Sequence, residues 1–231
     1  MKTIHILILS ISILFSLLVH SDEIKPSRAT LESNVGEMKV EMVKLENGSW
    51  KLNSLLDGGS IVRREESEIF ELIDNQIRPI NYRFNQRILF RRSKSSADFD
   101  WENKTVSYAE NKEKGNIVLS ENVLGPSSAS LQLRLDFREF GEKDIPDVIS
   151  YKVFWKGEIK NRTYDISKEK ESIETPFGTF DAYKVSRKFE NGNDRSQVFW
   201  LAPDLDFAVI KIYDKNDREI EIKIKNFEDL S

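Results

Sequence analysis

The stretch of sequence that decides the fold runs from residue 174 to residue 212 and reads ETPFGTFDAYKVSRKFENGNDRSQVFWLAPDLDFAVIKI. Pro176 fixes φ at a first corner, and Gly178 supplies the positive φ that a bulkier residue would resist. A strand is then predicted, with residues 180, 182, 184 and 186 on one face and 181, 183, 185 and 187 on the other, and residues 190–194 are predicted as a loop rich in residues that tolerate the left-handed conformation. Two further alternating segments follow, with an Ala-Pro turn between them. The stretch therefore predicts three consecutive antiparallel strands in a meander.

The sequence of this stretch resembles those of a family of exported bacterial proteins called domain of unknown function 3108. The recurrent pattern of that family is TP-x-G-TF-x-x-x-KV, a turn and a strand, followed by a W-x-AP-x-LD loop. The matching residues here are Thr175, Pro176, Gly178, Thr179, Phe180, Lys184, Val185, Trp200, Ala202, Pro203, Leu205 and Asp206. The resemblance implies an antiparallel, curved or barrel-like sheet in the cell envelope, and it brings no catalytic residues with it.

The rest of the chain shows the same alternation between short turns. Residues 38–42 and 50–56 alternate on either side of the hairpin signal Asn47-Gly48. Further strands are predicted at residues 87–92, 158–166 and 170–174. Residues 22–28 are polar, and we expect a mobile N-terminus there. No internal repeat or long linker divides the chain. The sequence predicts a mainly β protein with a single domain over 22–231, built as one antiparallel curved sheet or half-open β-barrel of about eleven strands with one short helix.

The position of that helix is ambiguous. Residues 127–140, SSASLQLRLDFREF, place leucines at every second position as a strand would, yet Gly125-Pro126-Ser127 is a helix-start signal. The family resemblance favours the helix, which would carry apolar residues on two opposite sides. A helix covered on both sides could plug the open end of a curved sheet.

The first 21 residues predict where the protein is located. Lys2 supplies a positive charge, residues 6–19 form an apolar run interrupted by three serines, and small or tolerated residues precede Asp22. We interpret residues 1–21 as a cleaved signal peptide, because the run is shorter than the roughly 20 apolar residues of a bilayer span; an uncleaved membrane anchor is the alternative. The chain has no cysteine, so it is not expected to be a lipoprotein, and no other stretch predicts a transmembrane segment. The predicted location is the periplasm.

The composition excludes several kinds of chemistry. Signal-peptide cleavage would remove His5 and His20, the two histidines of the chain, and the mature protein would contain neither histidine nor cysteine. Catalysis through a histidine base or a thiolate is then excluded, as are metal sites with nitrogen or sulfur ligands. The net charge of −4 argues against binding of nucleic acid, which needs a basic surface. We predict a protein that is not an enzyme, with no catalytic residues, no cofactor and no metal.

Five residues are candidates for ligand binding. Inward-facing aromatic side chains could line a cavity in the half-barrel, and a local basic cluster could meet a phosphate or a lipid headgroup. The aromatic candidates are Trp101, Trp155 and Trp200, and the basic candidates are Arg87 and Arg91. They support a first hypothesis, in which an envelope protein binds a hydrophobic or lipid-like ligand.

Two other functions stay open. The protein could be a scaffold that binds another envelope protein through a sheet edge. It could also be a carboxylate-dependent glycan hydrolase, because Asp98 with Asp100, and Asp204 with Asp206, place two carboxylates two residues apart.

Overall fold

The computed structural model describes residues 24–189, 195–216 and 219–231. The predicted signal peptide and the predicted loop at 190–194 lie outside these residues. Within them the chain forms fifteen strands, one α-helix, α1 (Ser128–Phe140), and one short 3-10 helix, η1 (Pro203–Leu205). The strands are β1 (Ser27–Ser33), β2 (Gly36–Lys44), β3 (Trp50–Asp57), β4 (Val62–Ile73), β5 (Gln76–Ile88), β6 (Arg91–Asp100), β7 (Thr105–Glu110), β8 (Glu113–Val118), β9 (Val123–Leu124), β10 (Val148–Trp155), β11 (Glu158–Thr175), β12 (Gly178–Lys188), β13 (Ser196–Ala202), β14 (Ala208–Lys215) and β15 (Glu219–Asp229).

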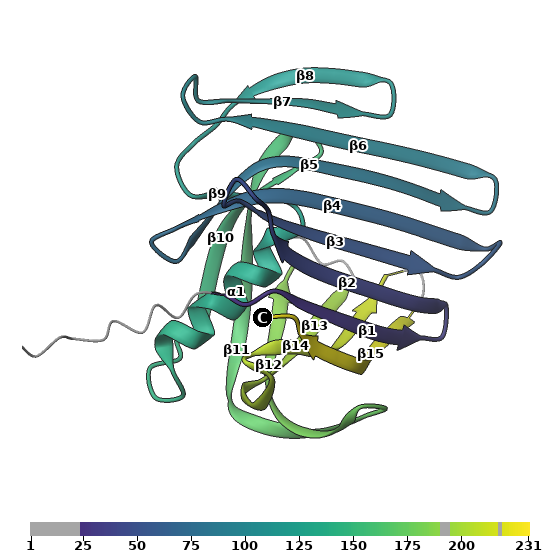
Figure 1. Cartoon of the computed structure of the whole chain (residues 1–231), viewed down its shortest axis with the longest axis vertical. Coiled ribbons are helices and arrows are strands. Elements are labelled where there is room, and N and C mark those ends of the chain that lie inside the picture. The colour runs from purple at the N-terminus through teal and green to yellow at the C-terminus, as the bar shows by residue number, and fades with distance from the viewer. Residues whose placement is uncertain (1–23, 190–194, 217–218) are drawn as a thin grey trace, which may run out of the picture.

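The described strands belong to one sheet, which is curved and not closed. Its order is β8-β7-β6-β5-β4-β3-β2-β1-β15-β14-β13-β12-β11-β10-β9, and neighbours are antiparallel except for β9 and β10. The N-terminal strand β1 pairs with the C-terminal strand β15, so the two halves of the meander are joined in the middle of the sheet (Figure 1). The edge strands β8 and β9 do not pair with each other. The predicted mainly β fold with a curved, half-open sheet is therefore confirmed.

The predicted number of about eleven strands is wrong. The strands missing from the prediction, β1, β8 and β9, are either polar or only two residues long, so they carry little periodicity. Residues 22–28 are not all mobile either, because Ile24 is buried and β1 begins at Ser27.

Two other strand boundaries differ from the prediction. Residues 87–92 do not form one strand; they contain the tight turn between β5 and β6, since Ile88 pairs with Arg91. The predicted strands at 158–166 and 170–174 form one long strand, β11, with a register shift between them.

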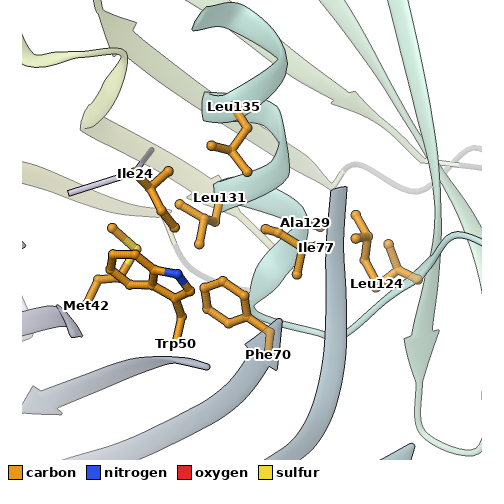
Figure 2. Packing of buried hydrophobic residues seen from close by; sticks show 10 residues of the cluster. Ile24, Met42, Trp50, Phe70, Ile77, Leu124, Ala129, Leu131 and Leu135 are labelled. Carbon is orange, nitrogen blue, oxygen red and sulfur yellow. The ribbon is translucent and has the colours of Figure 1, made fainter. Parts of the chain in front are cut away.

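Residues 127–140 contain a helix and not a strand, because the helix lies between the two halves of the sheet and buries residues on both sides. Leu131 and Leu135 point toward Trp50 and Phe70 of β3 and β4 (Figure 2). Leu133 and other residues one turn away pack against β11, β12 and β13. Leucines at every second position of this helix thus reach opposite faces of the core. The predicted helix with two covered sides is confirmed.

The antiparallel meander gives the half-barrel two different ends. Connections between successive strands alternate from one end to the other, so the turns β1–β2, β3–β4 and β5–β6 share one end with the last residues of β12 and β14, and we call it the open end. The C-terminus of α1 lies at the opposite end, where Glu139 accepts a hydrogen bond from Asn75 in the β4–β5 turn. The N-terminus of α1 points into the interior. The helix therefore fills the half-barrel from the end opposite the open end.

Candidate functional site

The N-terminus of α1 donates hydrogen bonds to a buried carboxyl group, that of Glu68. Glu68 of β4 is fully buried, and its Oε2 accepts hydrogen bonds from the backbone N–H groups of Ser127 at 3.0 Å and Ser128 at 3.3 Å. The helix has no side-chain cap of its own, so a carboxylate 59 residues earlier in the chain satisfies its free N–H groups. Gly125 fits beside this carboxyl because a Cβ there would lie 2.2 Å from Oε1. Glu68 thus docks the helix onto the sheet.

Burial makes Glu68 hard to ionise. Removal from water raises the pKa of its carboxyl from 4.5 to about 7, although the hydrogen bonds at the helix N-terminus oppose the rise. The neighbouring Glu66 raises the pKa further, and Glu66 itself is held by Arg64 at 2.6 Å and by the hydroxyl of Tyr82 at 3.2 Å. The interior beyond the helix is therefore polar and charged.

A group of three arginines lies at the open end, and we call it the interior arginine cluster: the half-buried Arg162 and Arg187, and Arg195, which is exposed at its edge. Burial and then the like charge of Arg162 lower the pKa of the Arg187 guanidinium to about 10. Arg187 donates to Gln197 at 3.2 Å, and its buried Nε has no hydrogen-bond partner within the described part of the chain.

One carboxylate, that of Asp214, interacts with two of these cations, Arg187 and Arg195. Asp214 accepts from Gln197 at 2.8 Å and lies 3.8 Å from Arg195. It also interacts electrostatically with Arg64 across the interior. Because Arg64 already pairs with Glu66, the cluster keeps an excess of positive charge on the inner face of β11 to β14. The arrangement can bind an anion.

The apolar side chains around this cluster are less buried than those around the helix. Phe199 and Ile212 face inward, as their pairing with β12 and β15 shows, yet both are only half-buried. Phe84, from the other half of the sheet, is also half-buried and lies under Arg64, whose guanidinium carbon is 5.4 Å from its ring. By contrast, Leu133 beside the helix is 1% exposed. The open end thus combines cationic and apolar groups that remain partly accessible.

The structure places the three predicted tryptophans apart. Trp101 donates to the backbone oxygen of Pro79 at 2.7 Å within the cluster of β5 to β8. Trp200 lies on the face of β13 away from the helix, where its Nε1 donates to Glu171 at 2.9 Å. Trp155 is the one that approaches the interior arginine cluster, because its ring lies 5.4 Å from the guanidinium carbon of Arg162. The tryptophans do not line a common pocket.

The two predicted arginines lie at a surface turn. Arg87 donates to the backbone oxygen of Gly59 at 2.9 Å, and Arg91 begins β6 on the exposed side of the same turn. They are close to each other but distant in the fold from the predicted tryptophans.

The two carboxylate pairs take structural roles. Asp98 pairs with Arg83 at 2.6 Å on the outer surface, and Asp100 accepts from Asn103 in the β6–β7 turn. Asp206 pairs with Arg134 at 2.7 Å and anchors α1, whereas Asp204 is exposed. Among the residues that the structure describes, no group of three or more acidic or histidine side chains could hold a metal ion.

The sequence did not single out Glu68, Arg162 or Arg187. A usable signal was present in the sequence. Arg187 shares its strand face with the apolar Tyr183 and Val185, and Glu68 lies two positions before Phe70, on the same face of its strand. A charged residue on an otherwise apolar strand face indicates a buried charge that needs a partner. That partner comes from distant strands, which a single sequence does not identify.

A shallow hollow of about 840 Å³ crosses the opposite, outer face of the sheet, from β1 to β7. Most of the residues around it are polar or charged, among them Lys51, Asn53, Arg83 and Lys94, but the surface that they present to the hollow is mainly apolar. None of the helices in the described residues has the length and hydropathy of a membrane span.

The fold and the site define a half-open β-barrel protein with an inserted helix and a charged interior. The chain belongs to the family described as "Protein of unknown function (DUF3108)", which it matches over residues 28–223. The predicted family membership is thereby confirmed. No curated protein matches the chain.

A solved structure shows a similar fold. The beta-barrel-like protein of domain of unknown function DUF1849 from Brucella abortus is 11% identical, with a TM-score of 0.58, and the match covers 90% of this chain and 99% of that chain. At this identity the likeness concerns the fold alone.

Proposed function

We propose that this protein is exported to the periplasm and there binds an amphipathic ligand, a hydrophobic or lipid-like molecule with an anionic headgroup, without catalysing a reaction. The observation that carries the proposal is the interior arginine cluster, in which Arg187 and Arg195 share the single carboxylate of Asp214 and Arg162 adds a further positive charge, beside half-buried apolar side chains. The headgroup, a carboxylate or phosphate, would bind the arginines, and the apolar part would lie against Phe199 and Ile212.

Two physical arguments support this ligand class. Guanidinium groups bind carboxylate and phosphate through paired, charge-assisted hydrogen bonds, which are stronger than neutral ones. An anion would also counter the burial and the repulsion from Arg162 that together lower the pKa of Arg187. Each apolar Å² removed from water adds roughly 25 cal/mol, so a hydrocarbon chain increases the affinity.

The test combines identification and binding. Protein purified from the periplasm would be analysed by native mass spectrometry, and its bound lipids would be extracted. The stripped protein would then be titrated with a fluorescent fatty acid. We expect Arg187→Gln to weaken binding about tenfold or more, because a hydrogen bond to a charged group contributes roughly 1.5–3 kcal/mol.

Arg83→Gln is the matched control, since Arg83 is an exposed arginine on the outer face of the sheet. We expect it to bind the fatty acid as the unaltered protein does. A protein that carries no ligand and takes up no fatty acid would contradict the proposal, as would equal affinities of the two variants.

The scaffold alternative has one supporting observation. β8 is an edge strand of six residues that pairs only with β7 in the sheet, and Val118 at its end is 78% exposed. An unpaired edge can accept a strand from another protein. Crosslinking in cells followed by pull-down should then recover one defined protein. Asn116→Pro in β8 should abolish its recovery, because proline has no backbone N–H to donate.

A further inference from the structure

The open end carries a group of exposed apolar side chains on two adjacent turns, which we call the tip surface: Ile61, Ile88, Leu89 and Phe90. Phe90 is 99% exposed, and the other three are between 45% and 60% exposed. The two turns are held together, because the N–H of Leu89 donates to the backbone oxygen of Ile61 at 2.8 Å and Ile88 pairs with Val62. The four side chains therefore form one continuous protrusion.

Folding does not explain why these residues are apolar. Leu89 adopts φ 51°, a conformation in which glycine or asparagine is favoured and leucine is strained. A polar residue at either Leu89 or Phe90 would build the same tight turn and avoid exposing apolar surface to water. The turn thus keeps two large apolar side chains in spite of their cost to stability.

The tip surface is surrounded by cations. The two segments that form it, residues 58–63 and 87–92, contain four arginines and no acidic residue, in a chain whose net charge is −4. The arginines are Arg63, Arg87, Arg91 and Arg92. Arg63 is balanced by Asp57 at 3.2 Å and Glu65 at 2.7 Å, whereas Arg87 contacts a backbone oxygen and Arg91 and Arg92 are exposed. The surface around the apolar tip is locally basic.

We infer that the tip surface docks this protein onto an anionic phospholipid bilayer. Phe90 and Leu89 would enter the boundary between headgroups and acyl chains, while the flanking arginines pair with lipid phosphates. A lipid surface fits better than a protein, since four side chains on a protrusion are far smaller than the roughly 800 Å² per side of a stable protein interface. Binding of this kind is weak, reversible and sensitive to salt.

Docking would orient the molecule. The tip surface lies on the turns β3–β4 and β5–β6, at the same end as the interior arginine cluster. A molecule docked in this way would turn its open end toward the membrane. The inference does not depend on the proposed function, because it rests on the surface alone and holds whether or not the interior binds a ligand.

The test measures how much protein sediments with vesicles. The protein purified from cells would be mixed with vesicles of phosphatidylethanolamine containing about one third phosphatidylglycerol, and with vesicles of phosphatidylcholine alone. We expect binding to the anionic vesicles that falls at high salt, and little binding to the neutral ones. Each Arg→Gln change at Arg91 or Arg92 should weaken binding about fivefold, as expected for the loss of one charge near an anionic surface.

The apolar contribution needs its own variants. Leu89→Asn with Phe90→Ser should lower the partition coefficient at least tenfold, and both new residues suit a tight turn, so the variant should fold. Val118→Ser on β8 is the matched control, since Val118 is exposed and lies at the other end of the strands. Phe90→Trp supplies a direct reporter, whose emission should shift to the blue on anionic vesicles and be quenched by brominated lipid.

Three outcomes would overturn the inference. The first is equal binding to neutral and anionic vesicles. The second is unchanged binding of the variant at Leu89 and Phe90, with its fold confirmed by circular dichroism. The third is an absence of vesicle binding together with self-association that the same variant abolishes in analytical ultracentrifugation, which would make the tip surface a contact between copies of this chain.

Discussion

Glu68 shows how one side chain can join distant parts of the chain. It lies on β4, in the N-terminal half of the chain, and it caps a helix that begins 60 residues later. Because the carboxyl is fully buried, its charge is opposed by loss of water and supported by two N–H groups and the helix dipole. Its protonation is therefore coupled to the stability of the fold.

This coupling predicts a pH dependence. The pKa of Glu68 is about 7 in the folded protein and 4.5 in the unfolded chain, so between these values the folded state holds a proton that the unfolded state releases. The free energy of unfolding should fall as the pH rises through this window, by up to about 3 kcal/mol at 1.36 kcal/mol per pKa unit.

Glu68→Gln isolates this contribution, because an amide keeps the shape and the acceptor but does not ionise. We expect the variant and the unaltered protein to differ little at pH 4.5 and the variant to be more stable at pH 8. Urea unfolding at a series of pH values measures the difference. A difference that does not vary with pH would show that Glu68 ionises as easily in the fold as in water.

At the scale of elements, α1 is central to the core. Leu135 is 1% exposed and packs with Met42, Trp50 and Phe70. We expect Leu135→Ala to lower the free energy of unfolding by about 2–5 kcal/mol, since it leaves a cavity between the helix and the sheet. Denaturant unfolding measures this change. Glu139→Ala, an exposed change on the same helix, should cost about 0.5 kcal/mol or less, and equal effects of the two would contradict the packing described here.

The sequence predicted some elements better than others for physical reasons. Strands in which apolar and polar residues alternate, such as β2 and β15, have a period of two that is visible in the sequence. α1 was ambiguous because both of its sides are covered, so its leucines recur every second residue as in a strand. β8 was missed because it is an exposed edge strand in which few residues need to be apolar.

The site was less predictable than the fold. Aromatic side chains could have lined a common cavity, but each predicted tryptophan contacts a different partner: Trp101 contacts Pro79, Trp155 contacts Arg162 and Trp200 contacts Glu171. The interior arginine cluster instead depends on the register of β11 and β12, which brings Arg162 and Arg187, 25 positions apart in the chain, to one face. Register is set by the whole sheet, so one sequence does not reveal it.

At the scale of the whole molecule, β15 joins the two halves of the sheet. It pairs with β14 on one side and with β1 on the other. Removing residues 219–231 should therefore expose both neighbours, broaden the thermal transition and lower its midpoint by more than about 10 °C, at roughly 2–4 °C for each kcal/mol lost. Removing Ser231 alone is the control and should change the midpoint little. Calorimetry measures both, and an unchanged transition without β15 would show that the halves fold independently.

The pairing of β1 with β15 also has a consequence for synthesis. The chain positions of Ser33 and Glu219 differ by 186 residues, so at ribosomal rates of 5–20 residues per second the first strand waits roughly 10–40 s for its second neighbour. During that interval the emerging chain carries an unsatisfied strand edge, which invites pairing with other nascent chains. We therefore expect that slower folding, or protection of the N-terminal half until the last strand has been made, would raise the yield of folded protein.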